Sequence, residues 1–169
     1  MPARSEVDVV AVDTKLPLRV AMEARDHSAV MDAFAENAVL RSPLTDNLAF
    51  EGREQLGPLV AVILEVLEDF TYTDELHDGQ AAVLLGHARV DGLRVQFCDH
   101  LKLRDDGLIE EMTVFFRPLP ATAAALRRFG DGLGRRKSRF RGRLINAMTA
   151  PLALMARTGD RVGVRMLQH

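Results

Sequence analysis

Three Asp-Gly pairs punctuate the middle of the chain, at Asp78-Gly79, Asp91-Gly92 and Asp106-Gly107, and they constrain the fold more than any other feature. Each pair lies between two runs of apolar residues, which is the pattern of a tight β-hairpin turn. The sequence therefore predicts four consecutive strands, joined as an antiparallel meander, over residues 70–77, 81–90, 93–103 and 108–117.

The residues before this meander have apolar side chains at helical spacing. They predict helices over about 17–25, 27–36 and 53–68, with a short strand over 38–41 and a loop over 43–52. The Gly57-Pro58 pair lies in the first turns of the third helix and predicts a late or kinked start. Helices followed by an antiparallel meander are typical of the α+β class, so we expect helices on one face of a curved sheet.

Acidic and basic residues are distributed unevenly along the chain. Residues 1–117 contain 22 acidic and 11 basic side chains, whereas residues 118–169 contain 2 and 11. This asymmetry predicts an acidic globular domain followed by a basic tail. Residues 121–129 are predicted to form a helix. We place the domain at residues 1–130, and a helical, basic and apolar C-terminal extension at residues 131–169.

The extension allows two interpretations. Six cations lie within residues 135–143, and the almost wholly apolar stretch 144–156 follows them. Such a segment can lie on an anionic membrane, or it can fold back on the acidic domain and cover its pocket. We favour packing on the domain because the chain has no tryptophan to anchor it at a membrane. No nucleic-acid partner is expected.

Other features restrict the location and the chemistry. The only cysteine is Cys98, and the longest apolar run, residues 59–64, is far too short to span a bilayer. No leader of basic residues followed by an apolar stretch is visible, so we predict a cytoplasmic protein. The sequence contains no phosphate-binding loop, catalytic triad or metal-binding spacing, and no cofactor is expected.

One acidic residue interrupts an otherwise apolar row. In the strand over 93–103 the odd-numbered positions are apolar, except that Asp99 stands in the middle. Burial of a carboxylate is costly unless the group is paired or stays protonated. Asp99 is therefore either a structural acid that is hydrogen-bonded to backbone or to a buried arginine, or a pocket acid that donates to a ligand or orients it, and it is the candidate catalytic residue.

The register of the preceding hairpin decides what lies beside Asp99. A two-residue turn at Asp91-Gly92 places Leu84 opposite Asp99, within a small and apolar inward row. A three-residue turn would instead bring His87 to Asp99 as an acid–base pair. We favour the first register because its inward row is apolar.

Three segments together resemble the nuclear-transport-factor-2-like superfamily, which includes SnoaL-like polyketide cyclases and ketosteroid isomerases. They are MDAFAENAVLRSP at 31–43, FEGREQLGPLVAVILEVLEDFTYTDEL at 50–76 and VQFCDHLKLRDDGLIEEMTVFFRPL at 95–119. The resemblance covers roughly residues 16–130. It implies a cone of curved antiparallel sheet wrapped by three helices, with a pocket between them and a homodimer formed through the outer sheet face.

The comparison with ketosteroid isomerase implies a role for each matching position. Asp99-His100 resembles the Asp-His whose aspartate donates a hydrogen bond to the steroid oxygen. Ser42 stands where the catalytic base would be, and Leu18 where the first-helix tyrosine would be. A serine has no useful basicity near neutral pH, so the isomerase would lack its base.

The expected function is binding of an apolar or polycyclic small molecule. Alternatives are an isomerase or cyclase that uses Asp99 as general acid or base, and an interaction module whose tail contacts a membrane or partner. Tyr72, the only tyrosine, is expected at the edge of the core. The residues expected to line the ligand site are Leu40, Ser42, Tyr72, Leu84, Gly86, Phe97, Met112 and Phe116.

Overall fold

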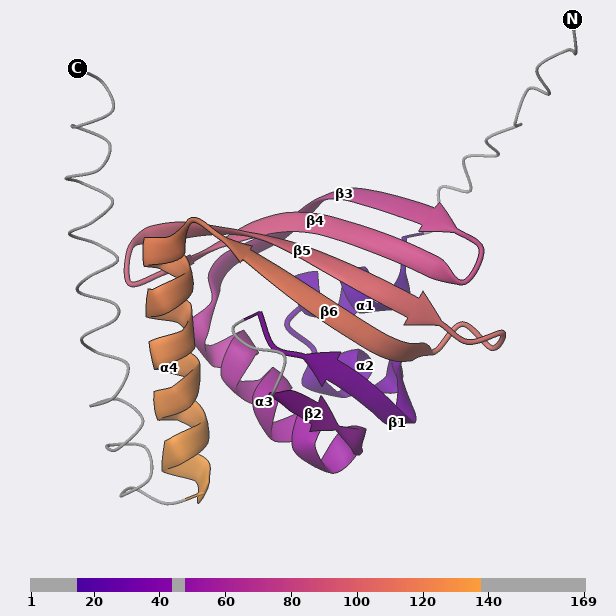
Figure 1. Cartoon of the computed structure of the whole chain (residues 1–169), viewed down its shortest axis with the longest axis horizontal. Helices are drawn as coiled ribbons and strands as arrows, with labels where there is room; N and C mark the ends of the chain where they lie inside the picture. Colours follow the sequence, from indigo (N-terminus) through magenta and orange to yellow (C-terminus); the bar gives the residue numbers. More distant parts are fainter. Residues whose placement is uncertain (1–14, 44–47, 138–169) are drawn as a thin grey trace, which may run out of the picture.

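A computed structural model describes residues 15–43 and 48–137 of the chain (Figure 1). Four helices and six strands follow one another in these ranges. In chain order they are α1 (Pro17–Glu23), α2 (His27–Asp32), β1 (Phe34–Arg41), β2 (Ala49–Glu51), α3 (Gly52–Val66), β3 (Glu68–Asp78), β4 (Ala81–Val90), β5 (Leu93–Leu103), β6 (Ile109–Arg117) and α4 (Leu119–Lys137).

The strands form one curved sheet in the order β2-β1-β6-β5-β4-β3. The four strands from β3 to β6 form the expected antiparallel meander, and β1 pairs with β6 in parallel. Helices α1, α2 and α3 lie under the concave side of the sheet (Figure 1). Buried apolar residues from these helices and from the strands form one core cluster between the two layers. The α+β class is therefore confirmed.

Three boundaries before the meander differ from the sequence prediction. Helix α2 ends at Asp32 rather than at 36, because β1 already begins at Phe34 and pairs with β6. The predicted loop 43–52 contains the three-residue strand β2, which is too short to show a period in sequence. Helix α3 begins at Gly52 and includes Pro58, so it starts before the Gly57-Pro58 pair rather than late.

The hairpin between β4 and β5 has the two-residue turn that we favoured. Asp91 and Gly92 both have positive φ, at 49° and 74°, as this kind of turn requires. Leu84 therefore lies opposite Asp99, and His87 pairs with Gln96 on the other face of the sheet. The register that would have joined His87 to Asp99 is excluded.

Helix α4 is longer than the predicted 121–129, and it crosses the boundary that we placed at residue 130. Arg127 and Arg128 both bind Asp91 in the β4–β5 turn, while Arg135 and Arg136 lie 3.5 and 3.6 Å from Glu65 of α3. The first two cations of the extension, Arg135 and Arg136, thus pair with one acid of the domain. The apolar stretch 144–156 lies outside the described residues. Within the described residues, no helix is both long and apolar enough to cross a membrane.

Candidate functional site

A buried hydrogen bond joins Tyr72 of β3 to Asp99 of β5. The phenol hydroxyl of Tyr72 donates to Oδ2 of Asp99 over 2.8 Å. The side chains are almost inaccessible, since Tyr72 is 2% exposed and Asp99 4% exposed. Asp99 is thus the misplaced acid that the sequence indicated, and its buried partner is the only tyrosine of the chain. We call these two residues the Tyr72–Asp99 pair.

The register of the strands fixes the position of the Tyr72–Asp99 pair in the sheet. Asp99 lies between Leu84 of β4 and Val114 of β6, so apolar side chains flank it on both neighbouring strands. Tyr72 lies opposite Gly86, which in turn lies opposite Phe97. A Cβ atom at Gly86 would stand 2.5 Å from the Phe97 ring, so the absence of a side chain there leaves room for that ring.

Aromatic rings surround the tyrosine. Phe70 and Phe97 both meet the Tyr72 ring edge to face, with centroids 4.9 and 5.4 Å away. Phe97 then contacts Phe116, and Phe116 contacts Phe129 of α4. The pair therefore stands beside a row of rings that leads from β3 to α4, and such surroundings are typical of sites for apolar ligands.

This environment changes the acidity of both groups. Burial raises the pKa of Asp99 to about 7, although the hydrogen bond from Tyr72 acts in the opposite direction. Burial, followed by the nearby Asp99, raises the pKa of Tyr72 well above its ordinary value. A carboxyl group that titrates near neutral pH can donate or accept a proton there, which is the property required of a general acid or base.

The other residues expected to line the site fall into two groups. Phe97, Phe116, Leu84 and Gly86 lie on the strands around the pair. Met112 lies two residues from Val114, the register partner of Asp99 on β6, whereas Leu40 and Ser42 belong to β1 and the residue after it. Leu40 of β1 pairs with Met112 of β6, and Ser42 follows the end of β1, where its backbone N–H donates to the carbonyl of Leu48.

Sequence reasoning missed four residues that contact this region. No local signal marks Phe70, because β3 changes register against β4 between Glu68 and Thr71, and none shows that Phe129 of α4 packs against Phe116. Arg19 and Glu23 of α1 bind the backbone of Tyr72. Within residues 15–43 and 48–137, no three His, Cys, Asp or Glu side chains gather to hold a metal ion.

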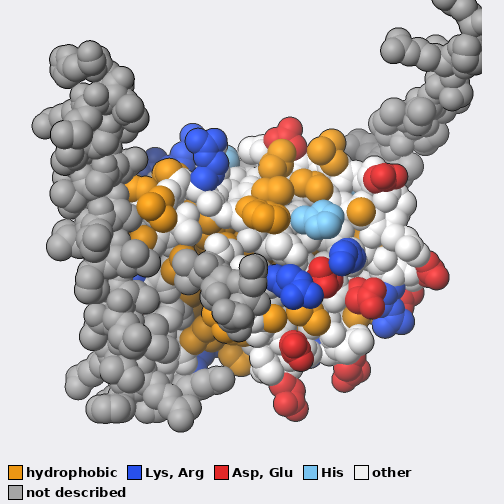
Figure 2. All heavy atoms as spheres, viewed as in Figure 1, with side chains coloured by type: hydrophobic (Ala, Val, Ile, Leu, Met, Phe, Trp, Pro, Cys, Tyr) orange, Lys and Arg blue, Asp and Glu red, His pale blue; other side chains and the backbone are white. Residues whose placement is uncertain are grey.

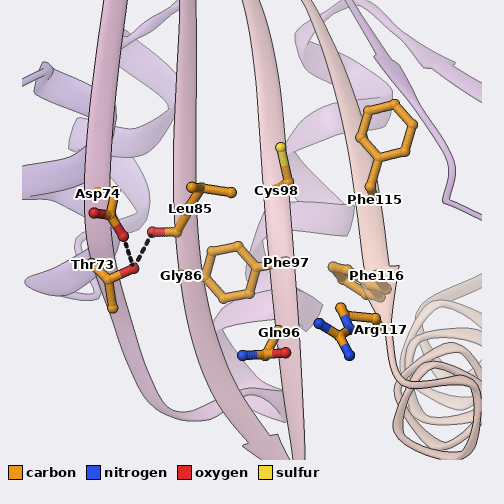
Figure 3. A pocket seen from close by; sticks show the side chains of 10 residues that line it. All are labelled: Thr73, Asp74, Leu85, Gly86, Gln96, Phe97, Cys98, Phe115, Phe116 and Arg117. Carbon is orange, nitrogen blue, oxygen red and sulfur yellow. Dashed lines mark hydrogen bonds between the residues drawn. The ribbon is translucent and has the colours of Figure 1, made fainter.

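A hollow of about 380 Å³ lies on the sheet, and its lining includes Gly86, Phe97 and Phe116 from the surroundings of the pair (Figure 3). Asp74, Leu85, Cys98 and Phe115 are register partners in one row across β3, β4, β5 and β6, and all four line it. Phe115 is 57% exposed. Figure 2 shows apolar side chains beside a histidine over β5 and β6. This outer face is thus partly apolar, unlike an ordinary solvated surface.

Comparisons with known proteins identify relatives of this fold. A steroid delta-isomerase from Pseudomonas aeruginosa is 28% identical and has a TM-score of 0.60, over 72% of this chain and 86% of that one. A bacterial protein with a cystatin-like fold from Silicibacter pomeroyi is 21% identical and has a TM-score of 0.63, over 71% of this chain and 82% of that one. A protein described as a SnoaL-like polyketide cyclase from Shewanella denitrificans is 14% identical, with a TM-score of 0.50 over 60% and 85%.

The model of the SnoaL-like domain family matches residues 18–112, which is more than half of the chain. A comparison with curated proteins gave no match. The chain belongs to the SnoaL-like domain family, within the nuclear-transport-factor-2-like and cystatin-like fold that the sequence resembles.

Proposed function

We propose that this protein binds an apolar or polycyclic small molecule at the Tyr72–Asp99 pair. The observation that supports the proposal is a hydrogen-bonded carboxyl group, 4% exposed, that stands among apolar strands beside a row of aromatic rings. The rings offer apolar contact area, and the carboxyl group offers one polar point that fixes orientation.

Asp99 retains hydrogen-bonding capacity for such a ligand. Oδ2 accepts from Tyr72. The other carboxyl oxygen can carry the proton near and below the pKa of about 7 and donate it to a ligand oxygen. A ligand with one polar oxygen on an apolar ring system would match this arrangement.

Binding of 2-naphthol, a neutral bicyclic phenol, tests the proposal. We expect saturable binding by isothermal titration calorimetry and a concentration-dependent rise in Tm. Asp99→Leu should weaken binding about 10-fold or more, since a hydrogen bond to a buried polar group is lost. Asp32→Leu, at a side chain that is 74% exposed, is the control and should bind normally. Equal binding by wild type and Asp99→Leu would exclude the site.

An enzyme of the isomerase or cyclase type is the second candidate. The pKa of about 7 at Asp99 favours it, because acid–base catalysis is most efficient when the pKa is near the working pH. The likeness to the steroid delta-isomerase adds support. Ser42 supplies no base, so Asp99 would serve both proton transfers. Turnover of a Δ5-3-ketosteroid that is lost in Asp99→Asn would establish this function, and absence of turnover in wild type would exclude it for that substrate.

A homodimer formed through the outer face of the sheet completes the proposal. The row that contains Leu85, Cys98 and Phe115 would be covered by the same row of a second copy, as a two-fold interface requires. Gln96 and His100 flank Cys98 on β5 and would supply polar contacts.

The remaining expectations stay proposals. We propose that the extension 131–169 packs on the acidic domain, in line with the contacts of Arg135 and Arg136 with Glu65. The cytoplasm is the proposed location, because a chain whose only cysteine is Cys98 makes no internal disulfide.

A further inference from the structure

Helix α1 binds the free edge of the sheet at Tyr72. Among the residues that the structure describes, β3 is the last strand of the sheet, and its outer edge has no strand partner there. The backbone N–H of Tyr72 donates to Oε1 of Glu23 over 3.1 Å, and its carbonyl accepts from the guanidinium of Arg19 over 2.9 Å. Two side chains of α1 therefore satisfy both backbone groups that an edge strand leaves unpaired.

Arg19 and Glu23 act as one unit. They are four residues apart on α1, and Nε of Arg19 lies 3.5 Å from Oε1 of Glu23. This spacing puts both side chains on the same stripe of the helix. The ion pair holds donor and acceptor in the places that the backbone of Tyr72 requires.

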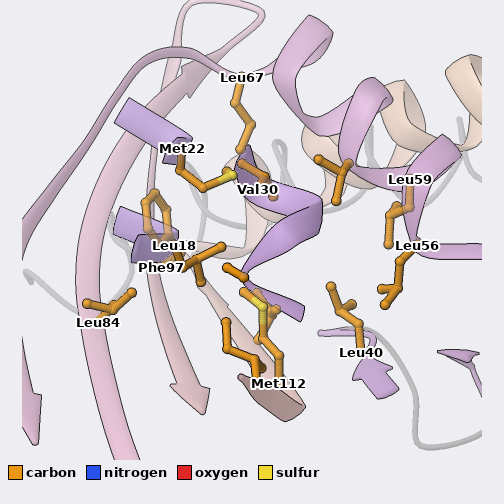
Figure 4. Packing of buried hydrophobic residues seen from close by; sticks show 14 of the residues in the cluster. Leu18, Met22, Val30, Leu40, Leu56, Leu59, Leu67, Leu84, Phe97 and Met112 are labelled. Atoms are coloured by element: carbon orange, nitrogen blue, oxygen red, sulfur yellow. The ribbon is translucent and has the colours of Figure 1, made fainter. Parts of the chain in front are cut away.

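The same helix covers the inner side of the site. Leu18, Ala21 and Met22 form the buried face of α1. They belong to one apolar cluster with Leu84 and Phe97. Figure 4 shows Leu18 and Met22 together with Leu84 and Phe97 in this cluster. Since both members of the Tyr72–Asp99 pair are at most 4% exposed, a ligand can reach them only when some covering element moves.

The attachments of α1 allow it to move without unpairing any strands of the sheet. It has only seven residues, too few for a stable helix without tertiary contacts. Near its N-terminal end, Glu75 accepts from the N–H of Leu16 over 2.7 Å and from Arg19 over 3.4 Å. After its last residue, Arg25 has a positive φ of 57°, and its guanidinium binds the carbonyl of Leu67 over 2.9 Å. Hydrogen bonds of side chains thus attach α1 and its flanking residues to β3 and to Leu67, whereas backbone ladders hold the strands together.

We propose that α1 is the gate to the Tyr72–Asp99 pair, and that Arg19 and Glu23 keep it closed by binding the backbone of Tyr72. Movement of α1 breaks both bonds at Tyr72 and uncovers its ring in the same step. Arg19 and Glu23 are therefore positioning residues, because they act on the site through Tyr72. That a ligand passes this gate rests on the proposed function, whereas the opening of the gate is a property of the protein without ligand.

Tyrosine fluorescence tests the gate directly, because the chain contains one tyrosine and no tryptophan. Acrylamide quenching of the full-length protein therefore reports the exposure of Tyr72 alone. In Glu23→Leu, which has no acceptor for the N–H of Tyr72, we expect the quenching constant to rise at least about two-fold through local opening. Arg19→Met should act in the same direction.

Two controls separate the gate from a general loss of structure. Glu23→Gln keeps an oxygen that accepts from the N–H of Tyr72, so its quenching constant should equal that of wild type. Arg104→Met removes an exposed ion pair with Asp106 at the far turn between β5 and β6, and it should also quench like wild type. If Glu23→Leu is folded by circular dichroism and has the same quenching constant as wild type, the proposal is overturned.

Hydrogen exchange of the wild-type protein keeps the proposal testable if a variant does not fold. Amides of α1 should exchange at least about ten-fold faster than those of β5, because the gate opens without global unfolding. Equal protection of α1 and β5 would overturn the gate. Both measurements use no ligand, so a failure of the gate is distinguishable from a failure of 2-naphthol to bind.

Discussion

The buried carboxyl group of Asp99 should make the stability of the protein fall as pH rises. Burial raises its pKa to about 7 in the folded state, against about 3.9 for an unfolded aspartate. Between these two pH values the folded protein keeps a proton that the unfolded chain has released. The free energy of unfolding therefore decreases from about pH 4 to about pH 7, and this contribution is constant above that range.

The size of the effect follows from the two pKa values. A difference of about 3 pH units, at 1.36 kcal/mol for each unit, corresponds to about 4 kcal/mol. Asp99→Asn removes the titration, yet it keeps an oxygen that accepts the hydrogen bond from Tyr72. The free energy of unfolding of the variant should differ from that of wild type by a fixed amount at pH 4. At pH 8 the difference should have shifted by about 4 kcal/mol in favour of the variant.

Urea unfolding followed by circular dichroism at closely spaced pH values measures this difference. Asp32→Asn, at a side chain that is 74% exposed, is the control for a change of net charge. A difference between Asp99→Asn and wild type that stays constant from pH 4 to pH 8 would refute the reasoning. An NMR titration of the Asp99 carboxyl group with a value at or below about 3.9 would refute it as well.

Three further predictions concern the neighbours of Asp99 and the outer face. Tyr72→Phe should raise the pKa of Asp99 further, as measured by NMR, because the lost hydrogen bond favoured the charged form. Gly86→Ala should cost about 1–3 kcal/mol in urea unfolding, since the new Cβ would meet the Phe97 ring and a backbone oxygen at 2.5 Å. Gly57→Ala, a helical position with open space, is its control and should gain about 0.5–1 kcal/mol. Phe115→Asp should convert the proposed dimer into a monomer by light scattering, and a wild-type protein that is already monomeric at micromolar concentration would contradict the interface.

The hairpins could be predicted from sequence because their signals are local. The alternation of β4 and β5 and the positive φ angles at Asp91-Gly92 involve residues that are close in the chain. The parallel pairing of β1 with β6 joins segments about 70 residues apart, and no local pattern specifies it. Strand β2 is too short for alternation to indicate it.

The site was predictable only in part, for the same reason. Asp99 was found because a polar residue stood out in a regular apolar row. Its partner Tyr72 was expected only at the edge of the core, and no local pattern joined it to Asp99. Strand β3 changes register twice against β4, once on each side of Thr71 and Tyr72. Each irregularity shifts the alternation of faces, so counting along β3 does not show which side chains point inward. Arg19 and Glu23 have the spacing of an ordinary surface ion pair, and only the edge position of β3 gives them a partner.

The cost of Asp99 distinguishes a functional acid from a structural one. Leaving this carboxyl group charged above pH 7 lowers the stability by about 4 kcal/mol, a large share of the 5–15 kcal/mol that holds a typical domain folded. A structural acceptor for Tyr72 needs no ionisable group, because asparagine offers the same oxygen without that cost. Asp99→Asn should therefore be a more stable protein at pH 8. If the same variant also loses ligand binding or turnover, the acid is retained for its proton rather than for the fold, as is expected where a local rule is broken at a functional site.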